Sequence, residues 1–218
     1  LEFRRVLFRS ITAKILISAW GGLNLPKLPN LNSLETFKGV SFHSARWNHT
    51  FDLTDKSVAV VGTAASAVQF IPEVAKKVKQ LFIFQRTPNW ITNRDDGTYS
   101  AQMQWYFKNF PILMQLHRGL LYLRNDLINF PLFTTGSSIG KNLQKHLEKR
   151  IHQEIADSGV RDAVMPSYQL GCKRILINND FYQTLNLKNV ELITDKIEII
   201  TTNSLVTEPG KDYKVDAI

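Results

Sequence analysis

The sequence is poor in cysteine and contains no internal repeat or low-complexity segment. Cys172 is the only cysteine among the 218 residues, which excludes an internal disulfide. A chain of this kind is typical of a reducing compartment, so we expect a cytoplasmic protein. The thiol of Cys172 is either a reactive thiolate or a small buried side chain, and we expect the buried side chain.

Long apolar runs are also missing. The nearest case, residues 110–133, is interrupted by His117, Arg118, Arg124 and Asp126, whereas a membrane-spanning helix needs roughly 20 apolar residues. We therefore expect no membrane span. An amphipathic helix packed on the protein core is the favoured interpretation of this stretch, and a helix lying on a membrane surface is the alternative.

The first ten residues, LEFRRVLFRS, do not suit a secretory signal, because arginines interrupt any apolar segment. They also fit poorly with the sequence that follows. We expect residues 1–10 to be an artefact of expression or of sequence assembly.

The net charge is +8, from 27 basic and 19 acidic residues. The basic residues are scattered and form no stripe interleaved with aromatic residues, so we expect no nucleic-acid partner and keep one only as an alternative. A polyanionic cofactor explains the positive charge equally well. Because 44% of the residues are hydrophobic, the chain can bury a sizeable core.

Apolar periodicity indicates a βαβ unit in the middle of the chain. Residues 57–61 are typical of a buried strand, 65–79 of a helix with one apolar face, and 80–84 of a second strand. The three segments together have the length of a βαβ unit. Pro72 lies inside the expected helix, and we expect it to kink the helix or to fall in a late first turn.

Other segments flank this unit. Residues 11–19 have the composition of a buried strand, and residues 100–160 are expected to be mostly helical, with Gly159 at the helix end. Further strands are predicted at 190–194, 196–201 and 213–218. The predicted fold class is therefore α/β: a Rossmann-like parallel sheet with a helical insertion and flanking linker strands.

A glycine-containing turn follows the first strand of the unit. In SVAVVGTAASAVQF, the G-x-G-x-x-G pattern has Gly62, Ala64 and Ala67 at its glycine positions. A tight turn at Gly62 allows the backbone to approach a pyrophosphate, which rests on the helix N-terminus. Ala64 adds one methyl group, which is tolerated if its φ stays negative. A small-residue turn that binds nothing is the alternative.

The second strand runs into Gln85-Arg86-Thr87, with Arg86 placed 24 positions (86 − 62) after Gly62. An acidic residue near this position would favour NAD, whereas arginine pairs with a 2′-phosphate and threonine adds a hydrogen bond. The pattern predicts NADP(H). A solvated basic residue at a strand end is the alternative.

Two further stretches contain polar residues. GCKRILINND places Lys173 and Arg174 ahead of an apolar run, which by itself indicates only the flank of a strand. Residues 37–47, FKGVSFHSARW, contain F-x-G-x-x-x-H-x-x-x-W. Because no carboxylate or cysteine lies near His43, we expect no metal site.

The combination of these stretches resembles a known family. The pattern F-x-G-x-x-x-H-x-x-x-W stands ahead of the dinucleotide fold, and SAWGGLNLPKLPN, VVGTAASAVQF, FQRTPNW and YQLGCKRILINNDFY occur around it in family order. From about residue 11 to residue 218, the chain resembles the central part of a flavin-dependent Baeyer–Villiger monooxygenase.

The resemblance implies a division of the chain into four parts after residues 1–10. These are 11–56, a remnant of the FAD domain and the interdomain linker; 57–100, the first part of the NADP-binding domain; 101–165, a helical insertion; and 166–218, the remainder of the NADP-binding domain and the return towards the FAD domain.

The resemblance also implies site residues. Those for NADP(H) are Gly62, Thr63, Ala64, Ala65, Ser66, Gln69, Arg86, Thr87 and Lys173, the arginine and threonine taking the 2′-phosphate. Arg174 corresponds to the family's active-site arginine, which lies near the flavin, stabilises negative charge there and contacts the nicotinamide. His43 belongs to the linker between domains and affects catalysis indirectly.

The implied activity is NADPH- and FAD-dependent insertion of one oxygen atom of O₂ beside the carbonyl of a ketone or other lipophilic substrate, which gives an ester or lactone. The FAD fingerprint is absent from this sequence, so we expect the fragment to be inactive alone. The alternatives are a flavin monooxygenase that oxidises nitrogen or sulfur, and an NADP-binding module without catalysis.

Overall fold

The computed structural model describes residues 2–5, 9–17, 19, 21, 25–29, 31–94, 96–132, 137–208 and 210–218. The strands are β1 (Glu2–Arg5), β2 (Arg9–Thr12), β3 (Ser57–Val61), β4 (Gln80–Phe84), β5 (Ile91–Thr92), β6 (Leu176–Ile177), β7 (Val190–Ile193), β8 (Ile197–Ile200), β9 (Ser204–Thr207) and β10 (Asp212–Lys214). The helices are α1 (Ala67–Ala75), α2 (Ala101–Asn109), α3 (Pro111–Leu132), α4 (Ser138–Glu154), α5 (Ser158–Val164) and α6 (Phe181–Thr184), with 3-10 turns at Leu34–Thr36 and Ser44–Arg46.

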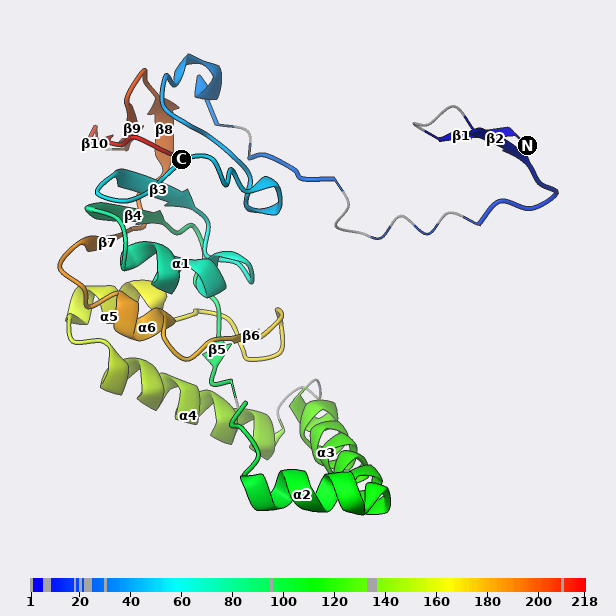
Figure 1. Cartoon of the computed structure of the whole chain (residues 1–218). Coiled ribbons are helices and arrows are strands. Elements are labelled where there is room, and N and C mark those ends of the chain that lie inside the picture. Colours follow the sequence, from blue (N-terminus) through cyan, green and yellow to red (C-terminus); the bar gives the residue numbers. More distant parts are fainter. Residues whose placement is uncertain are drawn as a thin grey trace.

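A parallel sheet of order β3-β4-β7 forms the centre of the molecule (Figure 1). Val58 pairs with Leu81, and Ile83 of the same middle strand pairs with Leu192. The predicted βαβ unit is confirmed: β3, α1 and β4 follow one another within the segments expected from periodicity. The α/β fold class is confirmed as well.

Alternate residues of these strands enter two separate cores, because successive side chains of a strand point to opposite faces of a sheet. Val58, Leu81 and Ile83 pack with α1, α4 and α6 in the larger core. Ala59 and Phe84 face the other way, into a smaller core closed by β8, β9 and β10. The sheet is therefore covered on both faces, as parallel sheets usually are.

Helix α1 covers one face of the sheet with the apolar stripe that its sequence predicts. Its buried residues include Ala67, Val68, Ile71, Val74 and Ala75. Pro72 lies within the helix and is buried. Because proline has no N–H, one hydrogen bond of the second turn is missing at this point.

The C-terminal segment connects the sheet to the linker that precedes β3. Ala217 forms parallel bridges to both Val40 and Val58. The N–H of Asp216 donates to the Ser57 carbonyl at 2.7 Å, and the Asp216 carboxylate accepts from the Ser57 N–H at 2.8 Å. Residues 215–218 therefore extend the central sheet beside β3, beyond the end of β10.

Several expectations about secondary structure need correction. β2 ends at Thr12, and Ile15 and Ile17 are 78% and 84% exposed, because no described strand pairs with residues 13–17. The predicted buried strand at 11–19 is therefore wrong. Gly159 does not end a helix: α4 ends at Glu154, and the Asp157 side chain accepts from the Val160 N–H at 2.9 Å and starts α5.

The segment expected to be an artefact forms a separate hairpin. β1 and β2 pair antiparallel, with Glu2 opposite Thr12. Figure 1 shows this hairpin apart from the other elements. Residues 1 and 6–8 of the segment lie outside the described residues.

The predicted helical stretch is confirmed as α2, α3, α4 and α5, but α2 and α3 are not packed on the core. Figure 1 shows them at the end of the molecule opposite β8, β9 and β10. Their exposed apolar side chains include Trp105, Tyr106, Leu116, Leu120 and Leu123. The expectation of core packing for residues 110–133 is therefore wrong for the described side chains. Within the described chain, no helix is long and apolar enough to cross a membrane.

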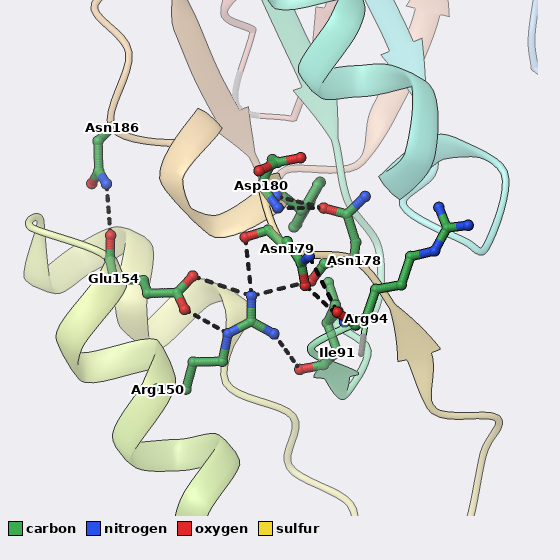
Figure 2. A network of polar contacts seen from close by, with 9 residues as sticks. Ile91, Arg94, Arg150, Glu154, Asn178, Asn179, Asp180 and Asn186 are labelled. Atoms are coloured by element: carbon green, nitrogen blue, oxygen red, sulfur yellow. Dashed lines mark hydrogen bonds and ion pairs between the residues drawn. The ribbon is translucent and has the colours of Figure 1, made fainter. Parts of the chain in front are cut away.

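A buried arginine links α4 to the strands β5 and β6 by hydrogen bonds (Figure 2). The Arg150 side chain is 6% exposed, and its Nε and Nη2 atoms donate to the two carboxylate oxygens of Glu154 at 2.6 and 3.2 Å. The other donations go to the backbone carbonyls of Ile91, Asn178 and Asn179 at 3.1–3.3 Å. The guanidinium also lies over the ring of Tyr182, 5.2 Å from its centroid.

The Arg150→Ala variant is expected to lower the free energy of unfolding by about 3–5 kcal/mol, because it leaves the Glu154 carboxylate and three inward-facing carbonyls without their donor. Urea denaturation measures the change. Lys149→Ala, an exposed position on the same helix, is the control and should stay within about 0.5 kcal/mol of the wild type. A loss below about 1 kcal/mol for Arg150→Ala would contradict the role given to this network.

Candidate functional site: the carboxyl end of the parallel sheet

The turn after β3 begins at Gly62, whose φ is +101°. Its N–H donates to the Phe84 carbonyl at 2.8 Å, so it continues the β3–β4 ladder by one residue. A Cβ built on Gly62 would meet no atom within 4 Å. Glycine is therefore favoured here by its backbone conformation and by access for a ligand, and not by crowding from the protein.

The residues after Gly62 alternate between the interior and the solvent. Thr63 is 5% exposed, whereas Ala64 and Ser66 are exposed. Ser33 and Asp55 are the non-glycine residues with positive φ in the described chain, so Ala64 has a negative φ. This is the condition under which the extra methyl group of Ala64 is compatible with a phosphate-binding turn.

The N-terminus of α1 opens onto the same exposed turn. Ser66 is the N-cap residue, and its hydroxyl makes no capping hydrogen bond. The N–H groups of Val68, Gln69 and Phe70 donate to the carbonyls of Ala64 and Ser66. The attraction of this helix start for an anion therefore comes from the positive end of the helix dipole. Gln69 is held against the turn, since its Nε2 donates to the Ala65 carbonyl at 3.0 Å.

Arg86 and Thr87 follow β4 at the edge of the sheet that also carries Gly62. The strands β3 and β4 are parallel, with Val61 opposite Phe84, so the carboxyl ends of both strands lie at the same edge of the sheet. Arg86 is exposed and has no ion-pair partner among the described residues. The structure thus places a free cation at the same sheet edge as the glycine turn.

Lys173 is connected to this edge through Tyr168. Its Nζ lies 4.5 Å from the centroid of the Tyr168 ring. The Tyr168 hydroxyl donates to the Pro88 carbonyl at 3.1 Å, and the Tyr168 carbonyl accepts from the Trp90 indole N–H at 3.0 Å. Burial raises the pKa of the Tyr168 hydroxyl, which keeps it protonated as a donor. Lys173 is therefore held against the segment that follows Thr87.

Arg174 and Cys172 lie next to Lys173 and are both exposed. The expectation that Cys172 is a buried side chain is wrong, because residues 171–174 cross the surface before β6 enters the core. Arg174 has no ion-pair partner among the described residues. Its guanidinium is accordingly available to a ligand.

Three residues of the histidine motif pack against the rest of the fold: Trp47 against the larger core, Phe37 against the smaller core, and Gly39 against Asp216. Trp47 packs edge-on against Phe42 and against Phe70 of α1, with ring centroids 5.1 and 5.2 Å apart. The Nδ1 of His43 accepts from the Ala45 N–H at 3.0 Å and caps the 3-10 turn that leads to Trp47. His43 is therefore a turn-forming residue of the linker.

Gly39 is the most crowded position of the motif. A Cβ there would lie 2.5 Å from the Asp216 carbonyl oxygen and 2.5 Å from the Phe37 ring. The same carbonyl accepts from the Val40 N–H at 3.1 Å. The glycine allows the linker to approach the C-terminal segment closely enough for this bond.

Two polar residues of the site escaped the sequence analysis. Gln85 and Asn89 both reach Thr63, the first through its side-chain amide oxygen and the second through its side-chain N–H. Both residues stand in the stretch FQRTPNW, which by itself assigns them no role. The burial of Gln85 at a strand end, where a polar residue needs partners, is the signal that could have identified it.

Taken together, these features define a dinucleotide-binding α/β fold: a parallel sheet with a glycine turn leading into a helix, and cations at the carboxyl ends of the strands. Residues 15–218 match the profile of the flavin-binding monooxygenase-like family, and the chain belongs to this family.

Curated and solved relatives agree with this assignment. The chain is 40% identical over 209 residues to a Baeyer–Villiger monooxygenase of Pseudomonas aeruginosa, covering 95% of this chain and 39% of that protein. It is similar to a solved steroid monooxygenase bound to NADP, with 25% identity and a TM-score of 0.82 over 100% of this chain and 48% of the other. OTEMO in complex with FAD and NADP gives 26% identity and a TM-score of 0.81, again over 100% and 48%.

The Gly39→Ala variant is expected to lower the free energy of unfolding by about 1–3 kcal/mol, because the added methyl group forces the linker away from Asp216. Gly119→Ala is the matched control: it lies inside α3, where a Cβ meets no atom within 4 Å. That variant should gain about 0.5–1 kcal/mol from helix propensity. Chemical denaturation distinguishes the two signs, and equal effects would contradict the close approach at Gly39.

Proposed function

We propose that this chain binds NADP(H) at the carboxyl end of its parallel sheet and belongs to a Baeyer–Villiger monooxygenase. The observation that carries the proposal is the placement of the exposed Arg86 at the same sheet edge as the Gly62 turn. A site with these two elements suits a dinucleotide that has both a pyrophosphate and a further phosphate on its ribose.

The residues are assigned by their positions. The backbone of residues 62–66 holds the pyrophosphate at the N-terminus of α1, with Gln69 supporting the turn. Arg86 and Thr87 take the 2′-phosphate, because a guanidinium forms strong bidentate hydrogen bonds with phosphate oxygens. Lys173, whose ammonium group lies over the Tyr168 ring, adds positive charge to the site.

The proposed segments follow from the same assignment. Residues 57–100 and 166–218 build the NADP-binding domain, residues 101–165 form a helical insertion, and residues 11–56 connect to an FAD domain. His43 then acts on catalysis only through this linker.

The reaction we propose consumes a ketone or related lipophilic carbonyl compound, O₂, NADPH and a proton, and yields an ester or lactone, NADP⁺ and water. NADP(H) supplies the reducing equivalents when bound. Arg174 contributes a fixed positive charge where negative charge develops, which lowers the barrier if its guanidinium is already in position. The exposure of Arg174 and its freedom from ion pairs within the described chain support this role.

FAD does not fit the residues of this chain. The FAD fingerprint G-x-G-x-x-G does not occur in the 218-residue sequence, in which no two glycines stand in a G-x-G arrangement. The chain spans about 40% of the length of the curated relatives it matches. We therefore assign FAD to the remainder of the full-length enzyme. The single cysteine, which is exposed, is compatible with the cytoplasmic location we propose.

The cofactor assignment predicts that NADP⁺ raises the thermal stability of the chain more than NAD⁺ does at equal concentration, because only a bound ligand stabilises the folded state. Arg86→Ala should weaken NADP⁺ binding by about ten- to a hundredfold, the value of a charge-assisted hydrogen bond pair, and leave NAD⁺ binding unchanged. Arg94→Ala, an exposed arginine paired with Asp96, is the control. Equal binding of NADP⁺ by wild type and Arg86→Ala would overturn the assignment.

The position of Ala64 supports a second prediction about the same site. Ala64→Gly is expected to tighten NADP⁺ binding by about fivefold, because it relieves a steric cost of about 1 kcal/mol for one methyl group at the closest approach to the pyrophosphate. Isothermal titration calorimetry measures the dissociation constant. Unchanged or weaker binding would show that the methyl group at Ala64 does not crowd the ligand.

A further inference from the structure

A buried hydrogen bond joins the glycine turn to the end of β4. The Oγ1 of Thr63 donates to the Oε1 of Gln85 at 3.2 Å, and both residues are 5% exposed. Thr63 lies between Gly62 and Ala64, and Gln85 directly precedes Arg86. The bond therefore connects the two backbone segments that carry the proposed phosphate contacts.

Gln85 is fixed at two further points. Its Nε2 donates to the Ala163 carbonyl of α5 at 3.0 Å, and its backbone N–H donates to the Ile193 carbonyl of β7 at 2.8 Å. A side-chain amide held at both ends inside the protein cannot rotate without losing a hydrogen bond. The Oε1 atom is thus presented to Thr63 in one orientation.

Thr63 forms a second bond to the same segment through its backbone. The Nδ2 of Asn89 donates to the Thr63 carbonyl at 3.0 Å. Both the side chain and the carbonyl of Thr63 are therefore bound to the segment 85–89.

We propose that Thr63, Gln85 and Asn89 form a positioning clasp that sets the distance between the glycine turn and Arg86. This inference rests on the proposed function and specifies its ligand. The clasp favours a 2′-phosphorylated dinucleotide that contacts both segments at once. In this proposal the three clasp side chains do not contact the ligand, and Thr63 contributes to the pyrophosphate site only through its backbone. They act by presenting two phosphate-binding segments at one fixed separation.

Removing the clasp should have an effect on ligand binding that a general loss of stability does not have. A ligand that bridges both segments gains from their fixed separation, because its second contact is already in place when the first forms. A ligand that contacts only Arg86 and Thr87 gains nothing from it. The clasp therefore predicts a change in the ratio of the two affinities.

Calorimetric titration of the 218-residue chain with NADP⁺ and with 2′-AMP tests this ratio. Thr63→Val removes the hydroxyl at almost unchanged volume, and it should raise the dissociation constant for NADP⁺ by about three- to tenfold, the value of one hydrogen bond. The constant for 2′-AMP should change by less than about twofold. Thr63→Ser keeps the hydroxyl and should restore the wild-type ratio.

A matched pair of glutamine variants separates positioning from stability. Gln85→Leu removes the clasp, and Gln144→Leu removes a half-buried glutamine of α4 that bonds to Leu170 and Glu148. Both should lower the melting temperature, and only Gln85→Leu should change the ratio of affinities. If Thr63→Val and Gln85→Leu weaken NADP⁺ and 2′-AMP equally, the clasp has no positioning role and the inference is overturned.

Hydrogen exchange on the ligand-free chain keeps this test separate from the cofactor assignment. Thr63→Val should speed exchange of the Gly62 amide, which donates to the Phe84 carbonyl, relative to Thr63→Ser. Unchanged exchange would refute the clasp even if NADP⁺ binds. Faster exchange in a chain that fails to bind NADP⁺ would support the clasp and refute the proposed cofactor.

Discussion

The parallel pairing of β3 with β4 is the constraint on which the rest of this structure depends. Hydrogen bonds between parallel strands bring both carboxyl ends to one edge of the sheet, and the bond from the Gly62 N–H to the Phe84 carbonyl extends this alignment by one residue. A glycine turn and a cation 24 positions apart in the sequence (86 − 62) thereby become neighbours along a single edge. Every role assigned to this edge follows from that geometry.

Two buried polar side chains then connect helices to strands that are distant in the sequence. Gln85 bonds to α5 and to the glycine turn, and Arg150 bonds α4 to β5 and β6. Nearly all polar atoms of these two side chains form hydrogen bonds. This lowers the free-energy cost of burying them. The helical segment is therefore attached to the end of β4 and to β5 and β6 by directional bonds as well as by apolar packing. The exposed faces of α2 and α3 take no part in this attachment.

Much of the fold and part of the candidate site could be predicted because they depend on local patterns. The β-branched run of β3, the apolar stripe of α1 and the position of Arg86 are all readable within about 30 residues, the length of a βαβ unit. The predictions are wrong where the burial of a residue depends on a partner that is distant in the sequence. Ile15 and Ile17 have the composition of a buried strand, yet nothing in the described chain covers them. Cys172 is small and apolar, yet it lies on a loop that crosses the surface.

The sequence by itself determined the βαβ unit, the glycine turn and the family, because periodicity and short motifs are properties of neighbouring residues. Only the tertiary structure decided what holds the site together. Thr63 lies in one family stretch and Gln85 and Asn89 in another, and neither stretch shows that these residues bond to one another. The hydrogen bond from Tyr168, whose ring also contacts Lys173, reaches Pro88 at a distance of 80 positions in the sequence. Such bonds depend on which strand ends become neighbours. The pairing of the strands and their packing between the two cores decide this, and both involve residues that are distant in the sequence.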